Sequence, residues 1–157
     1  ILLLGICGLI EWKYEFTGVK KLFRSEACRA FEQFADAHAR RKYPEAMKLT
    51  VGSALGTVQK EENLMNSPMG KHIKGIMAQL GGDVLGTSYK IEKDAKQADG
   101  SVQISALQTA RVYIQGSALG NYVHFQYSAT MVKSPEGWKV SEFKKDNLAN
   151  TSAPGGK

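Results

Sequence analysis

Cysteine and histidine are scarce in this sequence, with two cysteines and three histidines among 157 residues. No two of them have the spacing of two or four residues that is typical of zinc sites. Cys7 lies in an apolar segment and Cys28 in a predicted helix, so we interpret both as unpaired. The sequence therefore predicts no metal site and no cofactor.

Motifs for nucleotide binding and for nucleophilic catalysis are also missing. Gly70-Lys71 matches part of a phosphate-binding loop, but residue 65 is Met where glycine is required. Residue 72 is His where Ser or Thr is required, so we reject this motif. No serine-nucleophile motif occurs.

The longest apolar run, Ile1 to Ile10, is too short to cross a bilayer, which takes about 20 residues. We interpret residues 1–24 as the end of a signal or membrane anchor plus a basic linker, with Trp12 and Tyr14 at the membrane interface. The alternative is a short buried strand or helix. Basic residues after the run favour the cytoplasmic side, but short apolar leaders commonly export the domain behind them. We therefore expect a membrane-anchored or secreted, extracytoplasmic domain.

The net charge of +6 and the pI of about 9.3 raise the possibility of nucleic-acid binding. The basic residues, however, are spread along the chain and cluster only at 20–24 and 40–42. Without a basic stripe interleaved with aromatic residues, no nucleic-acid partner is predicted. The charge also suits anionic lipids or envelope polymers.

The first half of the chain carries helical patterns. Residues 25–42 place apolar side chains on one face, with Ser25 as the cap. Pro44 suits the start of a second short helix, and residues 53–66 fit a third although Gly56 lies inside it. Ser67-Pro68 begins a fourth helix, which ends before Gly81. Two copies of Gly-Ser-Ala-Leu-Gly, at 52–56 and 116–120, are predicted as loops.

The second half alternates apolar and polar residues, which predicts four strands. We expect them at 84–95, 102–115, 121–133 and 138–146, joined by turns at 98–100 and 134–137. The spacing in the last strand skips one position after Val140, which predicts a β-bulge. Helices followed by a strand meander predict an α+β domain at 25–147, with a disordered tail at 148–157.

This order of elements, with a helix bend at Tyr43-Pro44-Glu45-Ala46 and a closing Gly-Trp-Lys-Val hairpin, resembles the nuclear transport factor 2-like superfamily. That cystatin-like α+β cone is shared by ketosteroid isomerase, scytalone dehydratase, polyketide cyclases and many exported bacterial domains. The resemblance implies that the N-terminal helices pack in the concave face of a curved antiparallel sheet of four or more strands. It also implies that the convex face often pairs two subunits.

These implications give two groups of candidate residues. His38 lies in the middle of the apolar arc of the first helix, so the expected ligand pocket consists of His38, Phe34, Gln108, Tyr127 and Tyr89. The residues expected on the outer face, as an interface in a homodimer, are Thr109, Arg111, Tyr113, His124 and Gln126. No carboxylate occupies an inward strand position, which disfavours the usual acid or base of such enzymes.

We therefore expect a non-catalytic binding or assembly module, with a pocket for a small apolar ligand and a membrane contact through the N-terminal segment. One alternative is an isomerase or dehydratase that uses His38 and Tyr127. Another is a scaffold in an envelope complex, as similar domains serve in type IV secretion and mitochondrial import. In the structural interpretation, His38 is a hydrogen-bonded core residue and Gln108 marks a bulge or the cone rim.

Overall fold

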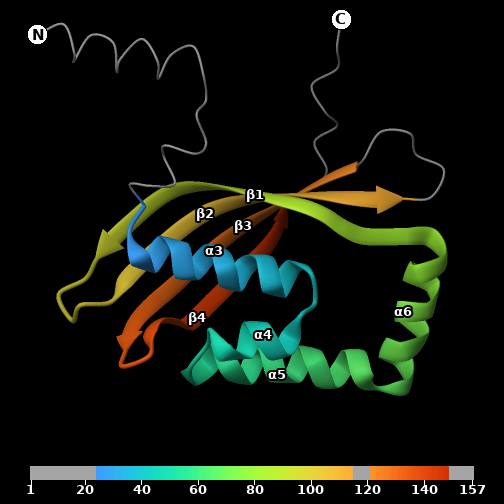
Figure 1. The fold of residues 1–157 in the computed structure, drawn as a ribbon, viewed down its shortest axis with the longest axis horizontal. Coiled ribbons are helices and arrows are strands. Elements are labelled where there is room, and N and C mark those ends of the chain that lie inside the picture. The colour runs from blue at the N-terminus through green and yellow to red at the C-terminus, as the bar shows by residue number, and fades with distance from the viewer. Residues whose placement is uncertain (1–23, 115–120, 149–157) are drawn as a thin grey trace, which may run out of the picture.

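The computed structural model describes residues 24–114 and 121–148, and in these residues four helices precede four strands (Figure 1). The predicted apolar leader, the tail after Leu148 and the second Gly-Ser-Ala-Leu-Gly copy lie outside the described residues. The helices are α3 (Glu26–Ala39), α4 (Tyr43–Lys48), α5 (Gly52–Asn66) and α6 (Pro68–Leu80). The strands are β1 (Gly81–Lys96), β2 (Val102–Ile114), β3 (Asn121–Ser134) and β4 (Gly137–Leu148). The expected α+β class is confirmed.

The helix boundaries follow from local chemistry. Ser25 caps α3, because its hydroxyl accepts a hydrogen bond from the Cys28 amide at 3.2 Å. After α3 the chain turns through Arg41, which has a positive φ of 57°, and Pro44 lies in the first turn of α4. Ser67 occupies the junction of α5 and α6, where its hydroxyl accepts from the Gly70 amide at 3.1 Å.

The prediction of a loop at residues 52–56 is wrong. This copy of Gly-Ser-Ala-Leu-Gly is the beginning of α5. Gly52, the first residue of the helix, has a positive φ of 57°, which glycine adopts without strain. The residue before it, Val51, donates its backbone amide to the Val140 carbonyl of β4 at 2.9 Å. A tertiary hydrogen bond therefore fixes where the helix begins.

The strands form one antiparallel sheet in the order β1-β2-β3-β4. Tight turns join β1 to β2 and β3 to β4, with positive φ at Gly100 (84°) and Gly137 (117°). The predicted bulge in β4 is confirmed, since Thr130 pairs with Glu142 and Met131 with Val140, which leaves Ser141 as the extra residue.

The core lies between α3 and the concave face of the sheet, and Figure 1 shows α3 lying across that face at an angle to the strands. Helix α3 contributes Phe31 and Phe34, which are both fully buried. Alternate residues of β2 and β3 are buried and form the inward faces of these strands, and they are Ile104, Ala106, Gln108, Ala110, Tyr127, Ala129 and Met131. Two backbone hydrogen bonds of Val140, with Leu49 and Val51, attach the segment between α4 and α5 to β4.

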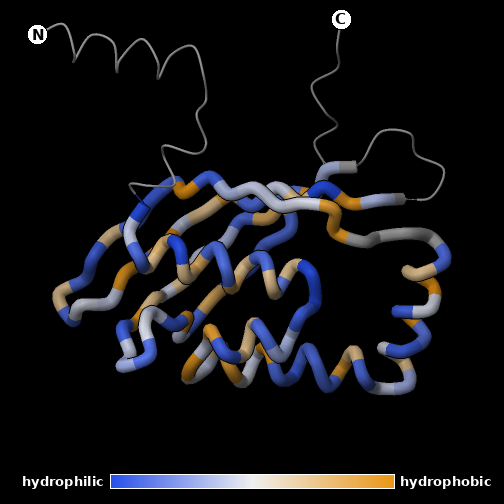
Figure 2. The backbone as a smooth tube through the Cα atoms, viewed as in Figure 1, coloured by the Kyte–Doolittle hydropathy of each residue, from blue (hydrophilic) through white to orange (hydrophobic). Residues whose placement is uncertain are grey.

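Helix α6 is the exception to this packing. It stands apart from α3 at one end of the molecule (Figure 1), and apolar positions recur along it (Figure 2). Met69, Ile73 and Ile76 keep 69%, 40% and 43% of their surface exposed. The predicted helix is correct, but its apolar stripe is not buried in the core.

Gly70 holds α6 against α5. A Cβ added to this buried glycine would lie 2.5 Å from the Met65 Cα and would also meet the Leu64 carbonyl oxygen. We expect Gly70→Ala to lower the free energy of unfolding by about 1–3 kcal/mol, because backbone cannot yield as a side chain can. Gly75→Ala in the same helix meets nothing within 4 Å, so it should raise stability by roughly 0.5–1 kcal/mol. Urea unfolding followed by circular dichroism measures both, and equal effects would contradict the close approach at Gly70.

Candidate active site in the cone

His38 is the centre of a buried polar cluster. It lies in the last turn of α3 and is 7% exposed. Its Nδ1 lies 3.3 Å from the hydroxyl of Tyr127 on β3, and its Nε2 lies 2.6 Å from Oε2 of Glu61 on α5. Both ring nitrogens thus have partners from separate elements, and the expected meeting of His38 with Tyr127 is present.

Aromatic rings enclose the imidazole of His38. Phe34 stacks on it with a centroid distance of 5.5 Å and an angle of 14° between the planes. Phe143 from β4 meets it edge-on at 5.2 Å, and Tyr43 from α4 lies at 6.5 Å. These rings hold the imidazole in place, and its two nitrogens face Tyr127 and Glu61.

Lys145 of β4 closes the cluster beside Tyr127. Its Nζ lies 4.0 Å from the ring centroid of Phe125 and 5.4 Å from that of Tyr127, which are cation–π distances. Burial lowers the pKa of Lys145 to about 8, opposed by the nearby charge of Glu61 and assisted by that of Arg41. Burial also raises the pKa of the Tyr127 phenol far above its usual value, and nearby Tyr89 and Glu61 add to this.

Gln108 and Tyr89 form a second polar pair instead of joining His38. The Gln108 Nε2 donates to the Tyr89 hydroxyl at 2.9 Å and to the Ala35 carbonyl at 3.3 Å. Phe31 makes edge contacts with both Tyr89 and Tyr127, at centroid distances of 6.4 and 5.6 Å. The single expected cluster is thus two pairs. Gln108 pairs in regular register with Tyr89 and Phe125, so the strand has no bulge at this residue. The buried side-chain oxygen of Gln108, Oε1, has no hydrogen-bond partner.

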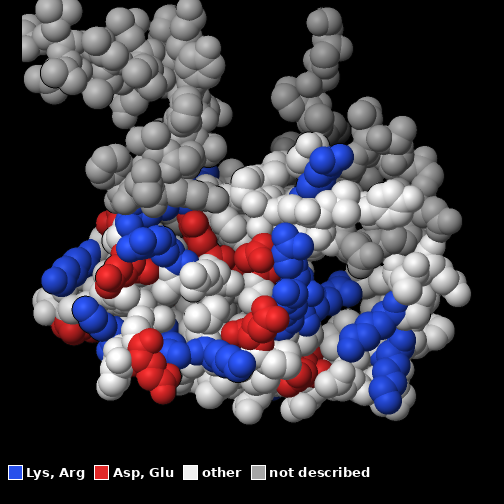
Figure 3. Space-filling model, in the orientation of Figure 1, with Lys and Arg blue, Asp and Glu red and all other residues white. Residues whose placement is uncertain are grey.

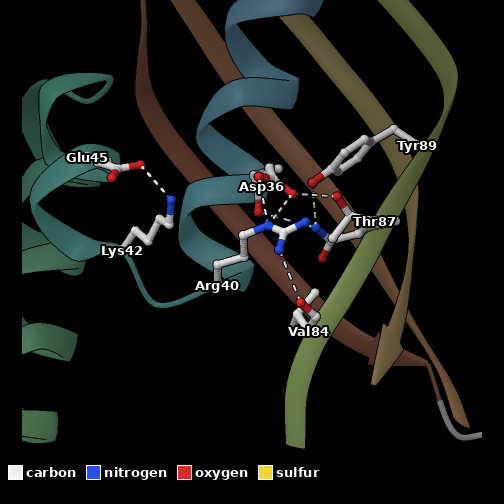
Figure 4. A network of polar contacts seen from close by, with 9 residues as sticks. Asp36, Arg40, Lys42, Glu45, Val84, Thr87 and Tyr89 are labelled. Carbon is white, nitrogen blue, oxygen red and sulfur yellow. Dashed lines mark hydrogen bonds and ion pairs between the residues drawn. The ribbon is translucent and has the colours of Figure 1, made fainter. Parts of the chain in front are cut away.

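A third polar group ties α3 to β1 (Figure 4). The Asp36 carboxylate accepts from the Thr87 hydroxyl at 2.6 Å and from the Arg40 guanidinium at 3.0 Å. Arg40 also donates to the Val84 carbonyl at 3.1 Å. Each of these charged groups has a partner within the chain, so we assign the group a structural role.

The predicted interface residues lie on the outer face of the sheet. The Thr109 hydroxyl lies 3.0 Å from Nδ1 of His124. The Gln126 side chain donates to Glu92 and Ser105 at 2.9 and 3.1 Å. Arg111 and Tyr113 are exposed, the latter to 47%.

Glu61 and Lys145 are the site residues that sequence reasoning missed. The buried residues of α5 are Ala54 and Val58, and Glu61 follows Val58 on the same side at helical spacing. Lys145 lies two residues after Phe143 and therefore on the same inner face. The predicted bulge at Ser141 shifts the alternation by one residue, and counting from it places Phe143 and Lys145 inward. Each is a charged residue on a face whose buried neighbours are apolar.

Among the residues that the structure describes, the remaining potential ligands form no further site. In the described part of the chain, no group of three His, Cys, Asp or Glu side chains is arranged to hold a metal ion. Cys28 is a buried free thiol whose pKa is raised by burial. No helix within residues 24–114 and 121–148 is long and apolar enough to cross a membrane.

Comparison with known proteins gives likenesses of structure only. No protein-family model matches the chain, and no curated protein sequence matches it. The VirB8 protein of Agrobacterium tumefaciens aligns with a TM-score of 0.52 at 11% identity, over 81% of this chain and 94% of that one. A ketosteroid isomerase-like protein from Erwinia carotovora atroseptica aligns with a TM-score of 0.49 at 10% identity, over 81% of this chain and 99% of that one. At such identities, the likeness concerns the fold alone.

The enclosure of His38 predicts a large contribution to stability. His38→Ala removes a buried ring and leaves the Tyr127 hydroxyl without its partner, so the free energy of unfolding should fall by about 2–4 kcal/mol. His72→Ala makes the same substitution at an exposed position of α6 and should change it by less than about 0.5 kcal/mol. Chemical unfolding of both variants measures the difference, and a stable His38→Ala protein would contradict the enclosed ring.

The lowered pKa of Lys145 predicts a pH-dependent stability. Between pH 8 and 10.5 the unfolded chain keeps a proton on this amine that the folded protein has released. The unfolded state then binds more protons, so the contribution of Lys145 to stability rises with pH across this window and is constant below it. Unfolding free energies from pH 7 to 10.5 for the unmodified chain and for Lys145→Met should diverge accordingly. Lys144→Met, at an exposed neighbouring position, is the control and should follow the unmodified chain.

Proposed function

Because the chain has the nuclear transport factor 2-like fold, we propose that it is a non-catalytic binding or assembly module that dimerises through the outer face of its sheet. The interface contains Thr109, Arg111, Tyr113, His124 and Gln126. The module is membrane-anchored or exported, and the apolar segment before the domain provides the anchor. In this proposal the outer face of the sheet is the assembly surface, and the buried cluster around His38 stabilises the fold.

The observation that carries the proposal is an exposed patch of two tyrosines and one leucine on the outer face. Tyr113, Tyr122 and Leu148 keep 47%, 52% and 40% of their surface exposed. Register places Tyr122 opposite Arg111 and Leu148 opposite His124, so these side chains share the face of the predicted interface. Tyrosine and arginine are enriched at protein interfaces, where the large ring is buried and the polar end finds a partner.

The interior of the cone supports a non-catalytic role. A general base must reach a substrate proton through a free nitrogen. Both nitrogens of His38 already face Tyr127 and Glu61, and the Tyr127 side chain has no exposed surface. In this conformation the cluster stabilises the cone, which favours the structural interpretation of His38.

A small apolar ligand remains part of the proposal, in the pocket of His38, Phe34, Gln108, Tyr127 and Tyr89. The buried Oε1 of Gln108 has no partner and would accept a hydrogen bond from a ligand hydroxyl or amide. The surrounding rings of Phe34, Tyr89 and Tyr127 would supply the apolar contacts.

The enzyme alternative is an isomerase or dehydratase with His38 as the base. One observation favours it: Glu61, His38 and Tyr127 form a continuous chain in which a carboxylate orients an imidazole toward a phenol. It requires Lys145 and Tyr127 to move aside so that a substrate reaches Nδ1. A His38→Ala variant of unchanged stability that has lost ligand binding would favour this alternative over the structural cluster.

Dimerisation is tested by mass in solution. The full chain should sediment as a dimer at micromolar concentration, and Tyr113→Glu with Tyr122→Glu should weaken the dimer at least about tenfold, because a charge replaces each buried ring. Ala98→Glu adds a charge in the turn at the opposite end of the sheet and should leave the dimer intact. A chain that stays monomeric at high concentration, or a double variant that dimerises normally, would rule out the outer face as the interface.

A further inference from the structure

We propose that α6 binds the surface of an anionic phospholipid bilayer, with Met69, Ile73 and Ile76 inserted at the boundary between headgroups and acyl chains. This contact is separate from the outer face of the sheet and does not depend on dimerisation. It also differs from the predicted anchor, since it uses a folded helix of the domain.

The apolar side of α6 has no cover. Met69 is 69% exposed, and Ile73 and Ile76, which follow at helical spacing, are 40% and 43% exposed. Leu64 in the last turn of α5 adds a fourth apolar side chain, exposed to 60%. The α5 backbone at Leu64 contacts α6 at Gly70, so these residues belong to one end of the molecule.

The positive charge around α6 favours an anionic surface as its binding partner. Residues 63–82 contain no Asp or Glu, whereas Lys71, His72 and Lys74 are all exposed. Arg41 lies beside α6, since its guanidinium reaches the Met77 sulfur at 3.1 Å. In Figure 3 the surface over α6 is blue and white, and the red of that view lies further left. An amphipathic helix with basic residues and no acidic ones has the character of a peripheral membrane helix.

A second copy of the chain is a poorer occupant for the same reason. Pairing two α6 helices would bring the lysines of one copy toward those of the other without any acidic partner in residues 63–82. Like charges disfavour such a pair, whereas each basic residue near an anionic leaflet is attracted to it.

The position of α6 lets it meet a flat surface. It lies at one end of the molecule, away from α3 (Figure 1), and joins the rest of the domain through the α5 junction and the start of β1. Its exposed apolar residues contribute nothing to the buried core. Insertion of these side chains into lipid therefore requires no unfolding of the cone.

The test is binding of the full chain to vesicles of phosphatidylcholine alone or with phosphatidylglycerol, combined with hydrogen exchange. Addition of anionic vesicles should slow exchange of the amides of residues 68–80, and vesicles of phosphatidylcholine alone should not. The localised readout separates α6 from any binding through residues 1–24. Exchange in α6 that anionic vesicles leave unchanged would overturn the proposal. Protection of α6 by high protein concentration without vesicles would overturn it too, since a second copy would then be the occupant.

Matched variants test the apolar contact. Ile73→Glu with Ile76→Glu should reduce the extra partitioning onto anionic vesicles at least about tenfold, because the change removes buried apolar groups and adds two negative charges. Gln59→Glu with Ala98→Glu adds the same charge at exposed positions outside α6 and should reduce it far less. Urea unfolding must give both double variants near-normal stability, which the exposure of the substituted positions predicts. Equal losses in the two variants would show that net charge alone governs binding, which would overturn the proposed insertion.

Discussion

The packing of Phe31 and Phe34 of α3 against the concave face of the sheet is the contact on which the rest of the structure depends. Phe31 touches the rings of Tyr89 and Tyr127, and Phe34 touches Phe143, so the two side chains reach three of the four strands. The core cluster that contains them also includes the small residues Ala106 of β2 and Ala129 of β3. Since this side of α3 faces the sheet, the next residue on the same side after Phe34 is also buried.

His38 is the residue that this packing draws inside, one turn after Phe34. A buried imidazole without partners would lose its hydrogen bonds to water at a cost of about 1–3 kcal/mol. Tyr127 and Glu61 replace those bonds and come from β3 and α5. The polar requirement of one side chain thereby links three elements, and it fixes how α5 is rotated relative to α3.

The strands and their inward faces could be predicted because alternation determines which side chains share a face. Periodicity also identified His38, Gln108 and Tyr127 as inward residues, but it did not show which of them bond to each other. Gln108 bonds to Tyr89 on β1, and the pairing of β1 with β2 shifts register twice before Tyr89, so this contact could not be read from the sequence. Glu61 was missed for a different reason. The buried side of α5 begins with Ala54, whose small side chain gives hardly any apolar signal, so the sequence pattern does not single out this side of the helix. The contact of Glu61 with His38 of α3 identifies it.

Helix α6 illustrates what periodicity leaves undetermined. A stripe of apolar residues predicts a helix with one apolar side, but it does not state what covers that side. In this fold the helices α3, α4 and α5 already supply the residues that cover the concave face, and the core holds no residue of α6.

The exposed side chains of Leu85, Tyr113, Tyr122 and Leu148 lie at the same end of the molecule as α6, where β1 and β3 begin and β2 and β4 end. The opposite end closes with two tight turns. The apolar surface of this domain is therefore concentrated at one end, and a fold whose core is complete without α6 leaves that surface available for contacts outside the domain.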